Sequence, residues 1–391
     1  MKAKPCVLCL AVWLSLTFPY HLKAEGETRT LRVGATVSET GKFSTEVGPF
    51  ARLIRNWAKK VNQEIKNFSI QVVVYDDRSD EATVRRLYER MAVVDKVHLF
   101  FGPYSSPLTF AASTVSENHH LPMIAICANS PKIYSRGYRW IVCVIDEAPR
   151  YSYRYWEMIK TQLQAKTVSF IVEDTLHPVG VYEGAERLAR QMGLGILSPY
   201  RFPPEAHDFT PAIAELRQKN PDIIFVSANI PMAINFMKQA RELDLNPREF
   251  HVIHHSGVFQ KALGAGAEWA TGQTYWLPGL KGMEPKWPVS LLQTAGFPLE
   301  DYPWAPAYMM AFQVAEAALR KAESWEPERL IQIIKALKVE TLGGLVQFRE
   351  NGVGSINTFP SQIQQGRYQI IWPPEVATGR YVYPRPTWSK R

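Results

Sequence analysis

The sequence predicts an α/β fold of two doubly wound halves, each a parallel sheet with helices on both faces. Short apolar strands alternate with helical segments along most of the 391 residues. This alternation is typical of βαβ units, whose strands are parallel and buried on both faces. The chain is 46% hydrophobic and 21% charged, an ordinary globular balance, and it is long enough for two cores.

The first half of the pattern runs from residue 31 to residue 145. Strands are predicted at 31–37, 70–77, 97–102, 122–126 and 140–145. Between them, the windows 49–66 and 82–94 carry apolar residues at three- and four-residue spacing, which predicts helices.

A second series of similar size follows. Strands are predicted at 167–174, near 200, at 222–228 and at 249–255, with helices at 182–192, 208–219 and 231–243. Residues 271–279 are rich in Gly and Pro and are expected to cross back to the first half. Helices at 303–322 and 326–337, a strand at 342–348 and an extended, proline-rich tail complete the chain.

The N-terminus has the layout of a secretory signal peptide, which we place at 1–24. Lys2 and Lys4 precede an apolar run at 5–18, and a short polar stretch ends near Ala24. The alternative is a membrane anchor of the same span. Cleavage would remove three lysines and no acid, which lowers the net charge from +8 to +5. We expect the mature protein to be periplasmic.

The remaining residues favour neither a nucleic-acid partner nor a catalytic site. The charges are scattered without a block of Lys or Arg, and no metal-protease, hydrolase, dinucleotide or P-loop motif occurs. We expect no cofactor and no metal. Asp76 and Asp77 could act as paired catalytic carboxylates, but a turn and helix cap is the favoured interpretation. Cys127 and Cys143 could form a disulfide or remain buried thiols.

Two polar segments interrupt the apolar pattern directly after successive predicted strands. They read GPYSSP (102–107) and CANSP (127–131). In each, Ser before Pro predicts the start of a helix, at Ser106-Pro107 and Ser130-Pro131. Ligands of open parallel sheets bind outside the carboxyl ends of the strands, and helix N-termini attract anions. The segments therefore predict a cradle for a small anionic or polar group; two ordinary capped helices are the alternative.

The order of further motifs resembles that of a transporter family. The motifs are LRVGATVSETGKFSTEVG, VVVYDDRSDEATVRRLYERM, FFGPYSSP, LPMIAICANSP, RGYRW, MKQARELDL and QIIWPPEVATGR. In order and spacing they resemble the periplasmic solute-binding proteins of branched-chain amino acid and amide ABC transporters, the Leu/Ile/Val-binding type. The resemblance implies two lobes joined by a three-crossing hinge. Lobe one would comprise 28–145 plus 277–353, and lobe two 146–276 plus 354–391.

The resemblance also implies ligand contacts. They map onto Tyr104, Ser105 and Ser106 for a carboxylate, onto Cys127, Asn129 and Ser130 in the next loop, and onto His177, Asn229 and His255 in lobe two. Tyr308 is a further candidate contact, as an aromatic residue that could pack against an aromatic acid. The acidic residue that binds an amino acid's ammonium in the family falls at His255 or Ser256. A buried ammonium needs a carboxylate or several acceptors. The departure therefore implies an amide, a urea-like compound or a small organic acid, including an aromatic one.

The function that the resemblance implies is binding rather than catalysis. We expect a monomeric extracytoplasmic receptor that captures an amino acid, amide or small organic acid and passes it to the membrane permease of an ABC transporter. A ligand-sensing, amide-type regulator or receptor of the same fold is the alternative. The signal peptide argues against a cytoplasmic regulator.

Overall fold

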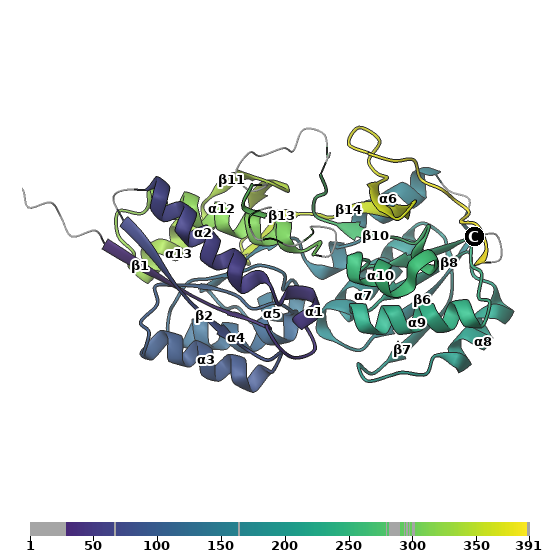
Figure 1. Cartoon of the computed structure of the whole chain (residues 1–391), viewed down its shortest axis with the longest axis horizontal. Helices are drawn as coiled ribbons and strands as arrows, with labels where there is room; N and C mark the ends of the chain where they lie inside the picture. The colour runs from purple at the N-terminus through teal and green to yellow at the C-terminus, as the bar shows by residue number, and fades with distance from the viewer. Residues whose placement is uncertain are drawn as a thin grey trace, which may run out of the picture.

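The computed structural model describes residues 29–388, except for 66–67, 163–164, 279, 281–289, 293, 295, 297 and 299–301. The predicted signal peptide at 1–24 lies outside the described residues. Two sheets lie side by side along the long axis of the molecule, and each is packed between helices (Figure 1). The predicted class, a doubly wound α/β fold, is confirmed.

The first sheet has the strand order β13-β5-β4-β3-β1-β2, and its paired strands are parallel. The strands are β1 (Arg29–Val37), β2 (Phe68–Asp76), β3 (Leu99–Phe101), β4 (Met123–Ala125), β5 (Ile141–Ile145) and β13 (Val353–Ile356). Every residue of β3, β4 and β5 is buried, as expected for strands covered on both faces.

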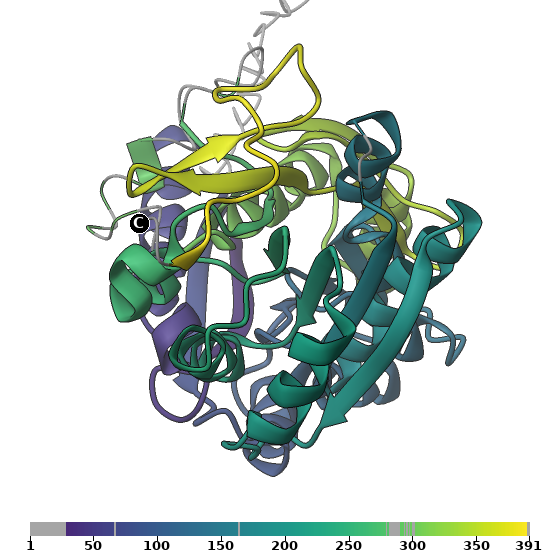
Figure 2. The same cartoon turned by 90° about the vertical axis from the view of Figure 1, so that its right-hand side faces the viewer.

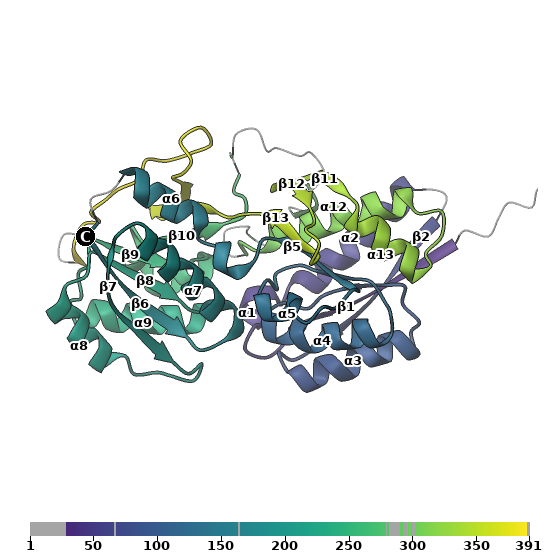
Figure 3. The ribbon, with the colours of Figure 1, turned by 180° about the vertical axis from the view of Figure 1, so that it is seen from behind.

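Helices cover both faces of this sheet (Figure 3). One face carries α3 (Glu81–Val93) and α4 (Ser106–Asn118), and the other carries α2 (Phe50–Glu64), α12 (Ala305–Lys321) and α13 (Pro327–Lys335). Trp57 of α2 stacks on Phe312 of α12 with ring centroids 4.9 Å apart. This contact joins a helix near the N-terminus to one that comes much later in the chain.

The second sheet has the strand order β15-β14-β10-β9-β8-β6-β7. Its strands are β6 (Thr167–Glu173), β7 (Gly195–Phe202), β8 (Ile223–Ser227), β9 (Glu249–Val252), β10 (Thr271–Thr274), β14 (Phe359–Gln364) and β15 (Arg367–Ile370). The last two form an antiparallel hairpin at one edge, drawn in yellow in Figure 2. The helices around it are α6 (Tyr153–Gln162), α7 (Leu176–Gln191), α8 (Thr210–Lys219), α9 (Ile230–Glu242) and α10 (Gly257–Leu263).

Short elements connect these layers. They are α1 (Ser44–Val47), α5 (Pro131–Tyr134), the 3-10 helices η1 (Ala148–Arg150) and η2 (Gly264–Ala267), and the hairpin β11 (Lys338–Thr341) with β12 (Gly344–Gln347). The strand predicted at 342–348 is one arm of this hairpin. Helix α7 begins at Leu176, earlier than the predicted 182. Pro178 does not prevent this, because it lies in the first turn of the helix, where no backbone N–H is needed.

The chain changes sheets after β5, after β10 and after β13. Strand β13 ends at Ile356, past the boundary at 353 that the family resemblance implies. Asp146, directly after β5, accepts from Arg150 Nε at 2.8 Å and lies 2.7 Å from Arg349 Nη1. This buried carboxylate therefore joins the first crossing to the turn that precedes β13.

Both sheets reverse their strand order at the same place in the pattern. In the first sheet β1 lies between β2 and β3, and in the second β6 lies between β7 and β8. Ligands of such sheets bind outside the carboxyl ends of the strands at this switch point. The fold thus predicts a site beyond β1 and β3 and beyond β6 and β8.

Candidate functional site

A cavity of about 140 Å³ lies at these switch points. Segments that follow β1, β3 and β4 form one side of it, and segments that follow β6, β8 and β9 form the other. Lys42, Pro204 and Pro231 are the exposed residues of its wall, so they mark its opening. A cavity of roughly 150 Å³ accommodates a benzene ring, so we expect an occupant of about that size.

On the side of the first sheet, the start of α4 faces the cavity. Ser105 is the N-cap, and its hydroxyl accepts from Leu108 N at 3.5 Å. Its φ of 81° lies in the left-handed region, which is rare for a residue with a side chain. The sequence placed the cap one residue later, at Ser106. Ser106 is instead fully buried, and its Oγ accepts from Ser130 N at 3.3 Å, joining the two polar segments.

On the side of the second sheet, Glu173 ends β6 and faces the start of α9. It accepts from Asn229 N at 2.8 Å, from Asn229 Nδ2 at 2.6 Å and from Thr175 Oγ1 at 3.2 Å. Burial raises the pKa of this carboxyl above its ordinary value. Three protein donors occupy its oxygens, so Glu173 acts as a cap that holds Asn229 and Thr175 in the wall.

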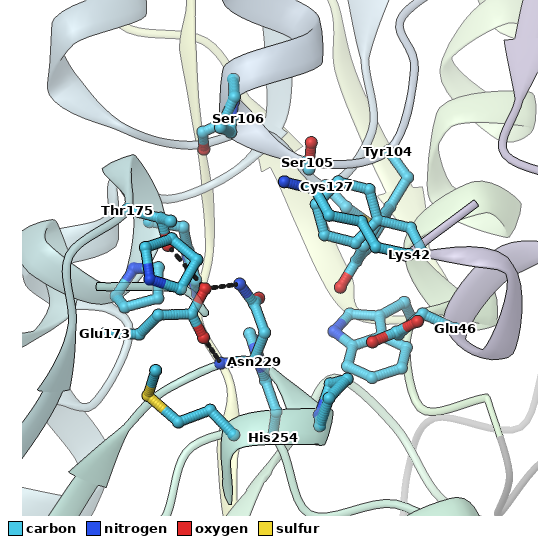
Figure 4. Close-up of a pocket in the computed structure, with 18 of the residues that line it drawn as sticks. Lys42, Glu46, Tyr104, Ser105, Ser106, Cys127, Glu173, Thr175, Asn229 and His254 are labelled. Atoms are coloured by element: carbon cyan, nitrogen blue, oxygen red, sulfur yellow. Dashed lines mark hydrogen bonds between the residues drawn. The ribbon is translucent and has the colours of Figure 1, made fainter. Parts of the chain in front are cut away.

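Glu46 of α1 brings a second carboxyl group into the wall. It is 1% exposed, and Oε2 accepts from Thr45 Oγ1 at 2.7 Å. Its Oε1 is buried without a hydrogen-bond partner. Burial raises the pKa of this carboxyl to about 7. Figure 4 shows Glu46 and Glu173 on opposite sides of the cavity.

Two histidines stack in the wall and are neutral at pH 7. The rings of His177 and His254 are parallel, with centroids 5.1 Å apart. Burial lowers the pKa of His177 to about 4 and that of His254 well below its ordinary value. His177 Nδ1 bonds to Asn129 Oδ1 at 2.7 Å, whereas His177 Nε2 and His254 Nδ1 are buried without partners. Together with Glu46 Oε1, the wall residues thus carry three unsatisfied polar atoms.

Aromatic rings make up much of the remaining wall. They belong to Phe43, Tyr104, Tyr151, Tyr275 and Trp304. Tyr104 contacts Phe43 and Trp304 edge-to-face, with centroids 5.4 and 5.8 Å away. Such a wall suits an occupant with an apolar body, because aromatic side chains prefer edge-to-face and offset contacts with other rings.

The structure brings six of the ten predicted site residues into the cavity wall. These are Tyr104, Ser105, Ser106, Cys127, His177 and Asn229. The other four are not wall residues. Asn129 and Ser130 lie behind the wall and hold His177 and Ser106, and Tyr308 packs on Phe50 at 4.5 Å. His255 lies 3.1 Å from Ser361 Oγ through its Nε2. His254 faces the cavity instead.

Sequence reasoning missed the two acids. It looked for the family's carboxylate at His255 or Ser256, found no acid there and inferred that the site has lost the partner of an ammonium group. The structure corrects this inference, because Glu46 and Glu173 come from other loops. A search of the last residues of each predicted strand would have found Glu173. Cys127 and Cys143 are both free buried thiols, and burial raises the pKa of each.

The family comparison agrees with this geometry. The sequence model of a family described as "periplasmic binding protein" matches residues 30–367. The chain belongs to the periplasmic binding protein family. Its fold and family are those of substrate-binding proteins rather than enzymes, and membership implies an extracytoplasmic location.

Individual relatives are of the Leu/Ile/Val-binding type. The Leu/Ile/Val-binding protein homolog 8 of Brucella abortus (strain 2308) is 23% identical over 342 residues, covering 78% of this chain and 80% of its own. The branched-chain amino acid transporter substrate binding protein LivJ of Streptococcus pneumoniae, solved with isoleucine, superposes with a TM-score of 0.75 at 18% identity. That match covers 91% of this chain and 100% of LivJ.

A solute-binding protein of an ABC transporter from R. palustris, solved with 4-hydroxybenzoate, also has a TM-score of 0.75 and 18% identity. That match covers 87% of this chain and 95% of the other.

Within the described part of the chain, no three His, Cys, Asp or Glu side chains cluster as metal ligands. No helix there has the length and hydropathy to cross a membrane.

Proposed function

We propose that this protein is the solute receptor of an ABC transporter and that it captures a small organic acid or amino acid for uptake. One observation carries the proposal: a small cavity at two apposed switch points, whose wall residues hold polar atoms that no protein group satisfies. Buried polar atoms in proteins are nearly always paired. An occupant that supplies the missing partners accounts for them.

The start of α4 is the proposed anchor for the carboxylate of the solute. A helix of thirteen residues presents free N–H groups and a partial positive charge at its N-terminus. Ser105 and Ser106 lie there in the wall, and Lys42 adds a positive charge at the opening. These groups favour an anion over a neutral amide.

The aromatic rings of the wall receive the body of the solute. The cavity volume matches one ring or a branched aliphatic chain. LivJ was solved with isoleucine and the R. palustris protein with 4-hydroxybenzoate; the two ligands represent these two shapes. We propose that the two halves close over the solute by a hinge motion at the crossings near Asp146, and that the closed form docks on a membrane permease.

A thermal-shift screen tests the proposal, because a ligand that binds only the folded state raises Tm. The screen pairs acids with their amides: benzoate with benzamide, and leucine with leucinamide. We expect at least one acid to raise Tm in a concentration-dependent way and its amide to do so much less. Equal shifts for acid and amide would refute the carboxylate anchor, and the absence of any shift would refute the solute class.

A further inference from the structure

Glu46 is placed to contact the solute directly. Its carboxyl group is 1% exposed in the cavity wall, and only Oε2 has a protein donor, Thr45 Oγ1. Oε1 is buried and unpaired. An unsatisfied buried acceptor is costly, so an occupant that donates to Oε1 recovers free energy that the empty protein lacks.

Glu173 does not offer the same opportunity. Its two oxygens already accept three hydrogen bonds from Asn229 and Thr175. Figure 4 shows these bonds as dashed lines on the side of the cavity opposite Glu46. The two acids therefore differ. Glu173 fixes the positions of Asn229 and Thr175 in the wall, whereas Glu46 has an oxygen left to accept a hydrogen bond.

We propose that Glu46 determines specificity by accepting, at Oε1, a hydrogen bond from a donor group on the solute. The protein then selects acids that carry a hydroxyl or an ammonium group in addition to the carboxylate. This inference rests on the proposed function and narrows its solute class. The residue that would recognise the donor group lies on α1, after β1, in the same half of the molecule as the proposed carboxylate anchor.

The surroundings of Glu46 predict how binding depends on pH. The titratable and charged groups that share its cavity are Lys42, Tyr104, Cys127, Tyr151, Glu173, His177, His254 and Tyr275. Burial keeps both histidines neutral and raises the pKa of the tyrosines and of the thiol. Of these groups, Glu46 has a pKa near neutrality, and burial also raises the pKa of Glu173 above its ordinary value.

A donor binds an ionised carboxylate more strongly than a protonated one. Because the pKa of Glu46 is about 7 in the empty protein, affinity for a donor-bearing acid should rise with pH between about 6 and about 8. The carboxylate and hydroxyl of 4-hydroxybenzoate, and the charges of leucine, keep their state over this range.

Calorimetric titration with two matched pairs of probes tests the inference. Benzoate and 4-hydroxybenzoate differ by a hydroxyl, and 4-methylpentanoate and leucine differ by an ammonium. We expect the donor-bearing member of one pair to bind on the order of tenfold to hundredfold more tightly. Glu46→Gln should remove most of this preference and flatten the pH profile. Glu183→Gln, an exposed change on α7, is the matched control.

The outcomes separate this inference from the function on which it rests. Equal affinity within both pairs, or a preference that survives Glu46→Gln, would overturn the role of Glu46 while carboxylate capture stands. A pH profile unchanged in Glu46→Gln would assign the titration to another group and would also overturn the role of Glu46. Failure of all four probes to bind would overturn the proposed solute class and, with it, this inference.

Discussion

Replacing Glu46 by Gln should stabilise the empty protein much more at pH 8 than near pH 5. The pKa of this carboxyl is about 7 when folded and 4.5 ordinarily, so the folded state binds the proton more tightly than the unfolded state does. Stability is therefore greatest below the ordinary pKa and falls as pH rises toward about 7. Two and a half pH units at 1.36 kcal/mol each give a loss of about 3 kcal/mol.

Gln is close in shape to the protonated carboxyl, so the variant should escape this loss. With an unfolding entropy of roughly 2.1 cal/mol/K per residue, about 3 kcal/mol corresponds to a rise in Tm of about 4 °C at pH 8. Thermal unfolding of the unliganded protein, followed by circular dichroism at pH 5 and pH 8, measures this. Glu183→Gln should shift Tm little at either pH. A Glu46→Gln variant with the same Tm offset at both values, or with a lower Tm at pH 8, would refute the reasoning.

Three further changes test other parts of the structure. Gly184→Ala should lower stability by at least about 2 kcal/mol, seen in urea unfolding, because the new Cβ would lie 1.9 Å from Pro149 O. Ser106→Ala should weaken binding of an acidic solute about tenfold in calorimetry, since it removes a buried hydroxyl at the anchor and the acceptor of Ser130 N; an unchanged Kd would remove Ser106 from the site. Cys127 should resist a thiol reagent in the folded protein and react on unfolding, as read by peptide mass spectrometry, because burial raises its pKa.

The alternation of strands and helices was enough to predict the fold class and most elements. Strands β1, β2, β5 and β6 are long or wholly apolar, and their positions follow from composition alone. The start of α7 could not be predicted in this way. Its first turn contains Pro178, which periodicity treats as a break, although the first turn of a helix tolerates it.

The site was predictable where it depends on local chemistry and not where it depends on packing. A Ser-Pro pair after a strand places the start of α4 within one residue. The choice between His254 and His255 is different. Both follow the end of β9 at Val252, so strand alternation no longer sets their direction. His255 turns away because Gly272 leaves room for its ring: a Cβ there would lie 2.3 Å from His255 Nδ1.

The position of Glu46 also explains why the family resemblance alone found no acid in the site. The resemblance looked for an acid opposite the carboxylate anchor, in the second half, and found His255 and Ser256. In the structure the acid with an unpaired oxygen lies in the first half, after β1, whereas the acid of the second half accepts hydrogen bonds from Asn229 at the start of α9. With one buried oxygen unpaired, this carboxyl group costs the empty protein stability above neutral pH. Under the role proposed for Glu46, a hydrogen bond from a bound solute offsets that cost.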